Sequence, residues 1–157
     1  MQNNEKQTIG IRCGYVAMVG RPNVGKSTLL NRVLDHKISI VTAKPQTTRN
    51  RILAIHNTDN AQIIFLDTPG LHSPRDSLGR YMIEEVESAI SNADICLFLI
   101  DVGEPKRGAG LTNRERSIAE KLAGSGKPLL ALINKIDLIR DTAIKQVAHG
   151  IRTDLTG

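Results

Sequence analysis

The sequence predicts an α/β domain in which helices cover both faces of a mostly parallel β-sheet. Short, nearly continuous apolar runs alternate along the chain with amphipathic stretches at helical spacing, as is typical of such sheets. A glycine-rich turn at residues 20–27 joins the first apolar run to the first helical stretch. The length of 157 residues suffices for one core of this kind.

Composition is that of an ordinary globular protein, with 40% hydrophobic and 24% charged residues. The longest clear apolar run, residues 95–100, is far shorter than the roughly 18 residues of a membrane span. The polar opening at residues 1–12 lacks the apolar middle of a signal peptide. We therefore expect a cytoplasmic protein with a flexible N-terminal extension at residues 1–13 and a single domain at residues 14–157.

The two cysteines are too few for a disulfide framework, and we expect Cys96 in the core and Cys13 to be incidental. The formal charge of +5 would suit a nucleic-acid or ribosomal partner through counterion release. Solubility and the neutralisation of bound phosphate explain that charge nearly as well. Aromatic residues make up 3% of the chain and leave little for base stacking.

The first half of the chain predicts three strands and one helix. The strands are expected at residues 14–19, 51–56 and 61–66, and the helix at residues 26–35. The second and third strands form a hairpin, because residues 57–60 have the composition of a turn. Residues 35–50 fit neither pattern and are expected to form a loop that ligand orders.

The second half continues the alternation. Helices are expected at about residues 79–93, from a cap at Thr112 to about residue 123, and at about residues 142–153. Glu115 stands three residues after Thr112, as a capping box requires. Strands are expected at residues 95–100 and 129–133, with a glycine-rich loop at residues 103–111.

Residues 20–27, Gly-Arg-Pro-Asn-Val-Gly-Lys-Ser, have the composition and position of a phosphate-binding loop. Gly20 and Gly25 let the backbone curl so that successive N–H groups converge on an anion, and the following helix directs its positive end at the same point. Lys26 would reach the outer phosphates, and the Ser27 hydroxyl would ligate a magnesium ion. The alternative is a glycine-rich turn that ends in Lys-Ser by coincidence.

Two more polar segments follow apolar strands. Asp67 ends the third strand, where a carboxylate would hold magnesium, and Gly70 offers an unobstructed N–H to a terminal phosphate. In Asn-Lys-Ile-Asp at residues 134–137, Asp137 can accept the paired hydrogen bonds of guanine, which adenine cannot offer. Each segment alone would also suit a surface turn. Together, at the carboxyl ends of parallel strands, they predict one guanine-nucleotide site.

From about residue 14 to 138 the chain resembles the Era family of translation-factor-like GTPases. The matching segments, in the family's order and spacing, are residues 20–27, Pro-Gln-Thr-Thr-Arg at 45–49, Asp-Thr-Pro-Gly-Leu-His at 67–72 and residues 134–137. The Gln-Thr-Thr-Arg stretch separates the chain from the relatives Der and MnmE. The resemblance implies a P-loop NTPase fold, a three-layer sandwich that binds GTP and Mg²⁺ and hydrolyses GTP to GDP and phosphate. It also implies assistance to small ribosomal subunit assembly and rRNA maturation, and peripheral membrane association of full-length members.

The resemblance assigns roles to single residues. Thr48, in preference to Thr47, would join the magnesium shell when GTP is bound, so that loss of the terminal phosphate would release Thr48 and Gly70 together. The implied catalytic residues are Lys26, Thr48 and Asn23, and the implied magnesium ligands are Ser27, Thr48 and Asp67. The implied nucleotide contacts are Gly20, Arg21, Pro22, Asn23, Val24, Gly25, Lys26, Ser27, Thr28, Asp67, Thr68, Pro69, Gly70, Leu71, Asn134, Lys135, Ile136 and Asp137.

Leu71 stands where many small GTPases have a glutamine that orients the attacking water. In related GTPases an asparagine at the position of Asn23 helps to bind potassium in the role of an arginine finger, which is worth about 10³ to 10⁵ in rate. We therefore expect slow intrinsic hydrolysis that potassium or the ribosome accelerates. His72 is the less favoured alternative as a base.

Era proteins carry a sixth strand and a C-terminal KH domain that this sequence does not show. We expect a fold truncated before its last strand, an exposed apolar edge at residues 129–133, loosened guanine binding and doubtful direct rRNA binding. One candidate function is a GTP hydrolase, and another is a nucleotide-dependent binding module with negligible hydrolysis. A non-functional fragment of a longer GTPase is the third. A module would contact its partner through Arg49, Arg51, Lys106, Arg107, Arg114 and Arg116.

Overall fold

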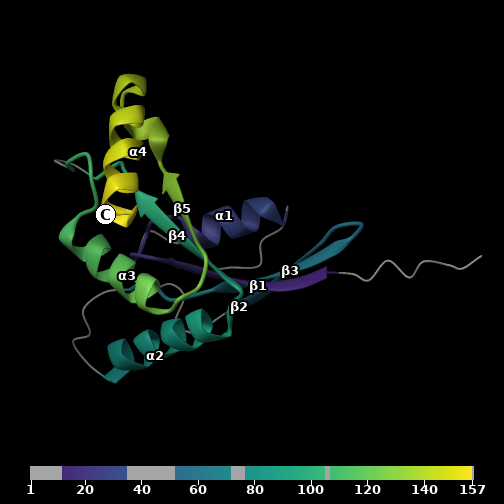
Figure 1. Cartoon of the computed structure of the whole chain (residues 1–157). Coiled ribbons are helices and arrows are strands. Elements are labelled where there is room, and N and C mark those ends of the chain that lie inside the picture. The colour runs from purple at the N-terminus through teal and green to yellow at the C-terminus, as the bar shows by residue number, and fades with distance from the viewer. Residues whose placement is uncertain (1–11, 35–51, 72–76, 105–106, 157) are drawn as a thin grey trace, which may run out of the picture.

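The computed structural model describes residues 12–34, 52–71, 77–104 and 107–156, which form a sheet covered by helices (Figure 1). Its five strands are β1 (Arg12–Gly20), β2 (Ile52–Asn57), β3 (Ala61–Asp67), β4 (Ile95–Asp101) and β5 (Leu129–Asn134). The helices are α1 (Lys26–Val33), α2 (Ser77–Asn92), α3 (Asn113–Gly124) and α4 (Asp141–Thr156), with a short 3₁₀ helix η1 (Ile136–Leu138).

The sheet has the strand order β2-β3-β1-β4-β5. β1 lies between β3 and β4 and is parallel to both, and β4 is parallel to β5. β2 is antiparallel to β3, as expected of a hairpin. The predicted mostly parallel α/β sheet is therefore confirmed, and the carboxyl ends of β1, β3, β4 and β5 lie at one edge.

Side chains alternate between two cores, because successive residues of a strand point to opposite faces. Ala17 of β1 and Phe98 of β4 pack with α2, α3 and Ile151 of α4. Met18 and Leu97 face the other way and pack against Leu30 of α1. The three layers of the molecule are thus α1, the sheet, and the helices α2, α3 and α4, which share one core (Figure 1).

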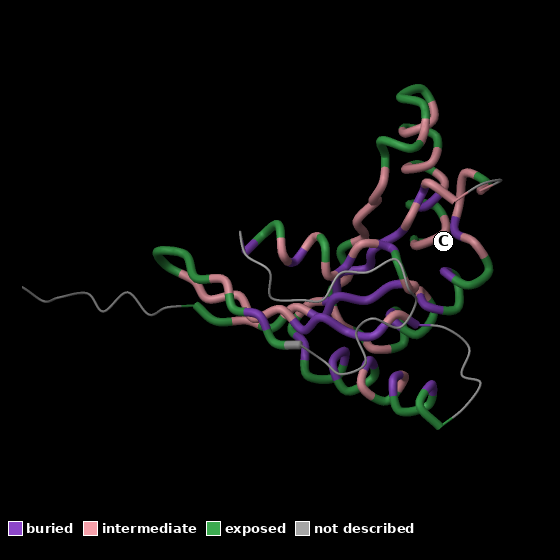
Figure 2. Tube along the Cα trace, turned by 180° about the vertical axis from the view of Figure 1, so that it is seen from behind, coloured by how far each residue is buried: buried purple, intermediate pink, exposed green. Residues whose placement is uncertain are grey.

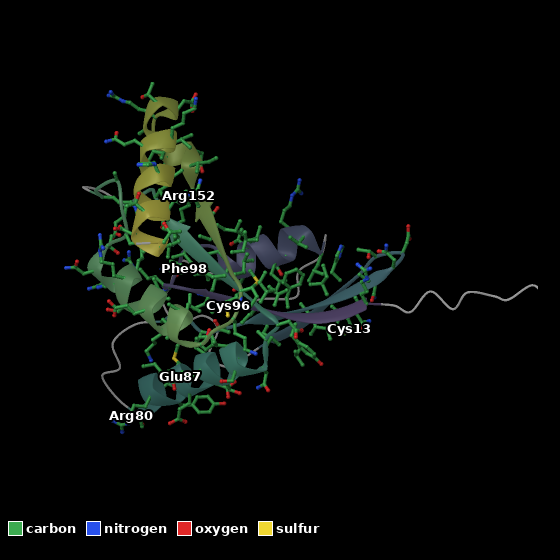
Figure 3. The ribbon with its side chains drawn as sticks, in the orientation of Figure 1. Cys13, Arg80, Glu87, Cys96, Phe98 and Arg152 are labelled. Carbon is green, nitrogen blue, oxygen red and sulfur yellow. The ribbon has the colours of Figure 1, made fainter. Side chains whose placement is uncertain are left out.

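Burial is greatest in the central strands (Figure 2). In β1 and β4, residues 17–20 and 96–100 are buried, whereas the hairpin turn at residues 57–60 is exposed. Figure 3 shows Cys96 and Phe98 inside the molecule and Cys13 at the start of β1. Cys96 is buried and Cys13 exposed, so the expectations for both cysteines are confirmed.

Element boundaries shift by a few residues from those expected. β1 begins at Arg12 and not at residue 14, and α1 ends at Val33, two residues early. The capping box of α3 is confirmed, since Thr112 Oγ1 accepts the Glu115 N–H and the Glu115 carboxylate accepts the Thr112 N–H. The 3₁₀ helix η1 was not expected, because three residues carry no periodicity.

β5 forms one edge of the described sheet, as expected for residues 129–133. Leu130 of this strand is 51% exposed, and Ile136 and Leu138 just after it are also exposed. No helix within the described residues is long and apolar enough to cross a membrane.

Candidate nucleotide-binding site

The phosphate-binding loop, residues 20–27, lies between the buried strand β1 and helix α1. Gly25 adopts φ 101°, a left-handed conformation that favours glycine, and has no side chain with which to cap α1. Helix α1 therefore begins without a side-chain cap, and helix N-termini bind anions through their backbone N–H groups and the helix dipole. Asn23 also has a positive φ of 61°, so the loop curls twice in succession.

Lys26 is buried inside this curl with 7% of its surface exposed. Its ammonium donates to two backbone carbonyls of the loop, Gly20 O at 3.3 Å and Arg21 O at 3.2 Å. Burial lowers the pKa of Lys26 to about 8, and the charge of Asp67 opposes that shift in part. A desolvated ammonium bonded to neutral carbonyls would gain strongly from an anion, as a phosphate-binding lysine requires.

Ser27 and Asp67 meet next to this lysine. The Ser27 hydroxyl lies 2.8 Å from Asp67 Oδ2, and Asp67 is fully buried at the end of β3. Its second oxygen, Oδ1, is buried without a hydrogen-bond partner among the described residues. A buried carboxylate oxygen without a partner is costly, and a hydroxyl beside a carboxylate is an oxygen donor set that Mg²⁺ prefers. The residues present therefore fit a magnesium ion.

The segment after Asp67 packs directly on the phosphate-binding loop. Thr68 is fully buried and donates from its hydroxyl to the Met18 carbonyl at 2.6 Å. The Leu71 N–H donates to Gly20 O at 3.0 Å. Gly70 approaches Pro22 so closely that a Cβ there would lie 2.5 Å from the proline nitrogen. The backbone of residues 68–71 thus contacts the phosphate-binding loop, together with which it is expected to bind the nucleotide.

Asn134 connects the far side of the site to the same loop. Its Nδ2 donates to the Val24 carbonyl at 2.7 Å, which joins residues 110 positions apart in the sequence. A Cβ on Gly25 would collide with this amide nitrogen. Gly25 is therefore required twice, for its backbone conformation and for the approach of Asn134.

Lys135 turns the chain out of β5. It has φ 62° and begins η1, which carries Asp137 with an exposed side chain. Its ammonium lies 2.6 Å from Asp101 Oδ2 at the end of β4, and Asp101 Oδ1 accepts the Gly103 N–H at 2.9 Å. Asp101 thus supports the turn from which Asp137 projects.

The structure brings together the three segments expected to meet, residues 20–27, 67–71 and 134–137. Four buried polar or charged residues stand out in the described part of the chain, namely Lys26, Asp67, Thr68 and Glu115. Three of these belong to the predicted site. Thr47, Thr48 and His72 lie outside the described residues, as do Arg49, Arg51 and Lys106.

One expectation is wrong. Arg107, expected as a partner contact, has a side chain only 3% exposed and pairs with Glu115 at 2.9 Å. An arginine that follows a lysine in a glycine-rich loop is expected at the surface, whereas the burial of Arg107 depends on its acidic partner on α3. Arg114 is exposed, and Arg116 is half exposed and pairs with Asp154 at 2.9 Å.

Sequence reasoning missed Asp101 and Glu104. Asp101 follows an apolar strand just as Asp67 does, so the same signal could have identified it. No local pattern marks Glu104, whose role depends on a contact with Arg21 across 83 positions of sequence.

A family model described as "50S ribosome-binding GTPase" matches residues 15–135. The chain belongs to this GTPase family. The matched range includes the phosphate-binding loop, Asp67 and Asn134 of the site described above.

Within this GTPase family, the chain is similar to curated proteins named GTPase Era. It is 50% identical over 133 residues to that of Geobacter metallireducens, which covers 85% of this chain and 43% of the relative. It is 44% identical over 146 residues to that of Leuconostoc citreum, covering 91% of this chain and 46% of the relative. The chain therefore spans less than half the length of the curated relatives it matches.

Solved structures give the same picture. A crystal structure of Era with MgGDPNP and nucleotides 1506–1542 of 16S ribosomal RNA has a TM-score of 0.85 and 42% identity, covering 93% of this chain and 49% of that one. An Aquifex aeolicus Era variant bound to GDP·AlF₄⁻ has a TM-score of 0.80 and 41% identity, covering 88% and 46%. Arabidopsis thaliana Toc33, at 14% identity and a TM-score of 0.72, shares the fold. The predicted resemblance to Era is confirmed.

Proposed function

We propose that the chain is a guanine-nucleotide switch domain that binds GTP with Mg²⁺ and hydrolyses it to GDP and phosphate. The observation that carries this proposal is the convergence of Lys26, the Ser27–Asp67 pair and Asn134 on one loop at the carboxyl edge of the sheet. A lysine, a metal-binding pair and a base-recognition segment are the parts that phosphoryl transfer needs in P-loop proteins.

The phosphate half of the proposed site acts through the backbone of residues 20–27 and through Lys26. With a nucleotide bound, the ammonium exchanges its two neutral carbonyl partners for phosphate oxygens. These oxygens carry negative charge and therefore form stronger hydrogen bonds with the ammonium. Residues 21–24 and Thr28 surround the phosphates, and the N–H of Gly70 contacts the terminal phosphate. The site's lysine and backbone donors stabilise charge that develops during hydrolysis.

Ser27 and Asp67 hold the magnesium ion in this proposal, with Thr48 joining them when GTP is bound. Magnesium, when present, neutralises negative charge on the phosphates. Asp67 contributes the buried oxygen that has no partner among the described residues. The Era structure with MgGDPNP supports this assignment, because that protein is 42% identical over most of the chain.

The base half recognises guanine through Asp137, with Asn134 and Lys135 fixing its position. Asp137 accepts hydrogen bonds from N1–H and the exocyclic amino group of guanine, while Ile136 and the neighbouring backbone line the base. Adenine lacks this pair of donors and would leave the carboxylate unpaired. GTP and GDP are therefore expected to bind in strong preference to ATP and ADP.

One observation favours a second function, a nucleotide-dependent binding module with negligible hydrolysis. Leu71, at the position where many small GTPases carry a water-orienting glutamine, is 9% exposed and apolar. It can neither donate to water nor accept from it, so the described residues supply no such group at this position. Single-turnover hydrolysis with and without ribosomal particles separates an enzyme from a module.

We also propose that potassium accelerates hydrolysis, through Asn23. This residue is exposed on the phosphate-binding loop with a positive φ of 61°, at the position where related GTPases bind the ion. Turnover in potassium should exceed that in sodium by about 10-fold or more if the ion acts as an arginine finger does. Equal rates in the two salts would count against this role.

For the partner, we propose the small ribosomal subunit and its rRNA. The family description names the 50S particle, but the Era crystal structure contains 16S ribosomal RNA. The chain is 42% identical to that Era protein, which favours the small subunit. Because the chain spans under half of such relatives, rRNA contact by these 157 residues needs its own test.

Binding of labelled GDP and GTP to the 157-residue chain tests the proposal first, with magnesium present and ATP as competitor. Saturable binding that excess ATP does not displace is expected. Displacement by ATP would contradict the proposed selection of guanine by Asp137. Absence of any binding would overturn the proposed function.

A further inference from the structure

A network of four alternating charges connects the phosphate-binding loop to the segment after β4. Arg21 of the loop forms a bidentate salt bridge with Glu104, from Nη1 to Oε2 at 2.6 Å and from Nη2 to Oε1 at 3.1 Å. The same Nη1 lies 3.9 Å from Glu115 Oε1. Glu115 in turn pairs with Arg107 at 2.9 Å. We call these four residues the charge network.

The inner half of the network is firmly held. The side chains of Glu115 and Arg107 are 1% and 3% exposed. The Glu115 carboxylate also accepts the Thr112 N–H at 2.9 Å, and Arg107 donates to Asp101 O at 2.9 Å and Gly110 O at 3.1 Å. Arg107 Nε is buried without a partner among the described residues, but the other hydrogen bonds hold the ion pair in place, and displacing a buried pair of this kind is costly.

The outer half attaches the phosphate-binding loop to this fixed base. Arg21 is 17% exposed and Glu104 38% exposed, so their pair is reached by solvent. The bond with Glu104 raises the pKa of Arg21 and lowers that of Glu104, which keeps both groups charged near neutral pH. Two parallel charge-assisted bonds fix the direction of the guanidinium as well as its distance.

Arg21 also takes part in the phosphate half of the site through its backbone. Its carbonyl accepts from Lys26 Nζ at 3.2 Å, so the residue held by Glu104 is one of the two that position the buried lysine. The loop binds phosphates through its backbone N–H groups, and that function requires the loop to keep its shape.

We propose that Glu104 is a positioning residue for nucleotide binding, which acts through Arg21 to hold the phosphate-binding loop in its ligand-ready shape. This inference rests on the proposed function. Glu104 does not touch the nucleotide in this account. Its effect is on how long the nucleotide stays bound, and base preference stays with Asp137.

The test compares Glu104→Gln with Glu120→Gln in the full 157-residue chain. Glu104→Gln keeps the shape of the side chain and removes its charge, and Glu120 is an exposed glutamate on α3 that serves as a matched control. The dissociation rate of fluorescently labelled GDP is measured with magnesium present, together with the thermal midpoint of the nucleotide-free protein.

We expect Glu104→Gln to raise the GDP dissociation rate about tenfold, because two charge-assisted bonds to the loop are weakened. The thermal midpoint should change by about 2 °C or less, since solvent-reached ion pairs contribute little to stability. Glu120→Gln should change neither quantity. In an Arg21→Gln background, Glu104→Gln should raise the GDP dissociation rate little further, because the bond that it weakens is already absent.

The outcomes separate the two proposals. If wild type binds GDP and Glu104→Gln releases it at the wild-type rate, the positioning role is wrong and the proposed function stands. A fall in thermal midpoint without faster release would mark the pair as a stabilising contact and overturn the inference. If wild type binds no GDP, the proposed function fails and the positioning role fails with it.

Discussion

The phosphate half of the site lies at the centre of the sheet, whereas the base half lies at its edge. Lys26 and Asp67 are buried where β1 and β3 end, between neighbouring strands on both sides. Asp137 is exposed on η1 after the edge strand β5, beside the exposed Ile136 and Leu138. The phosphate half is therefore held by burial in the core, whereas the base half is held by a few polar contacts at the surface.

This difference indicates that the two halves of the site contribute differently to stability and to ligand preference. The buried half is preorganised by the core, so its residues affect folding and binding together. The edge half is joined to the fold through the Asn134–Val24 and Lys135–Asp101 contacts, so the exposed Asp137 can change ligand preference without changing stability, whereas Asn134 affects both. Four predictions test this division, from the largest expected effect to the smallest.

Asp137→Asn should reduce the preference for GDP over ADP by about 10³-fold or more, because the carboxylate proposed to accept both guanine donors is lost. The thermal midpoint of the nucleotide-free protein should not change, since Asp137 is exposed. Competition binding with GDP and ADP measures the preference. Asp59→Asn, in the exposed hairpin turn, is the control, and a large loss of stability in Asp137→Asn would contradict the division.

Gly25→Ala should lower the free energy of unfolding by about 2 to 3 kcal/mol. A side chain at φ 101° is strained, and the new Cβ collides with the Asn134 amide nitrogen, so both halves of the site are disturbed. Urea unfolding measures the change. Gly124→Ala on α3 has no atom within 4 Å of the added Cβ and should be neutral or stabilising. Equal effects of the two substitutions would argue against strain at Gly25.

Asn134→Ala should cost about 1 to 2 kcal/mol, because the Val24 carbonyl loses its side-chain donor. GDP should dissociate several times faster, since the base half loses its direct bond to the phosphate-binding loop. Stopped-flow release of labelled GDP and urea unfolding report the two effects. Asn113 is exposed, so Asn113→Ala serves as the control. Unchanged GDP release in Asn134→Ala would show that the Asn134–Val24 bond does not couple the two halves of the site.

The smallest expected effect concerns pH and Glu104. The bond with Arg21 lowers the pKa of Glu104, so its contribution to stability is present above the ordinary glutamate pKa. That contribution is lost as the pH falls through the lowered value. The small difference in thermal midpoint between wild type and Glu104→Gln should therefore be present at pH 6 and shrink as the pH falls below the ordinary glutamate pKa. A difference that persists at lower pH would assign it to shape and not to charge.

The elements and the site segments were largely predictable because their signals are local. Apolar alternation marks β4, and the spacing of Gly20, Gly25 and Lys26 marks the phosphate-binding loop within eight residues. The burial of Arg107 was not predictable, because it depends on Glu115 and on how the loop folds back onto α3. The end of α1 at Val33 was also not predicted, because the helical pattern of the sequence continues past this residue.

By itself the sequence determined most of the strand and helix pattern, the phosphate-binding loop and the segments proposed to recognise guanine and magnesium. All of these depend on neighbours within a few positions, where backbone geometry sets the spacing. The tertiary structure alone decided that Asn134 bonds to Val24 across 110 positions and that Arg21 bonds to Glu104 across 83. Contacts of this kind arise from the order of strands in the sheet, because parallel pairing brings the ends of distant strands to one edge.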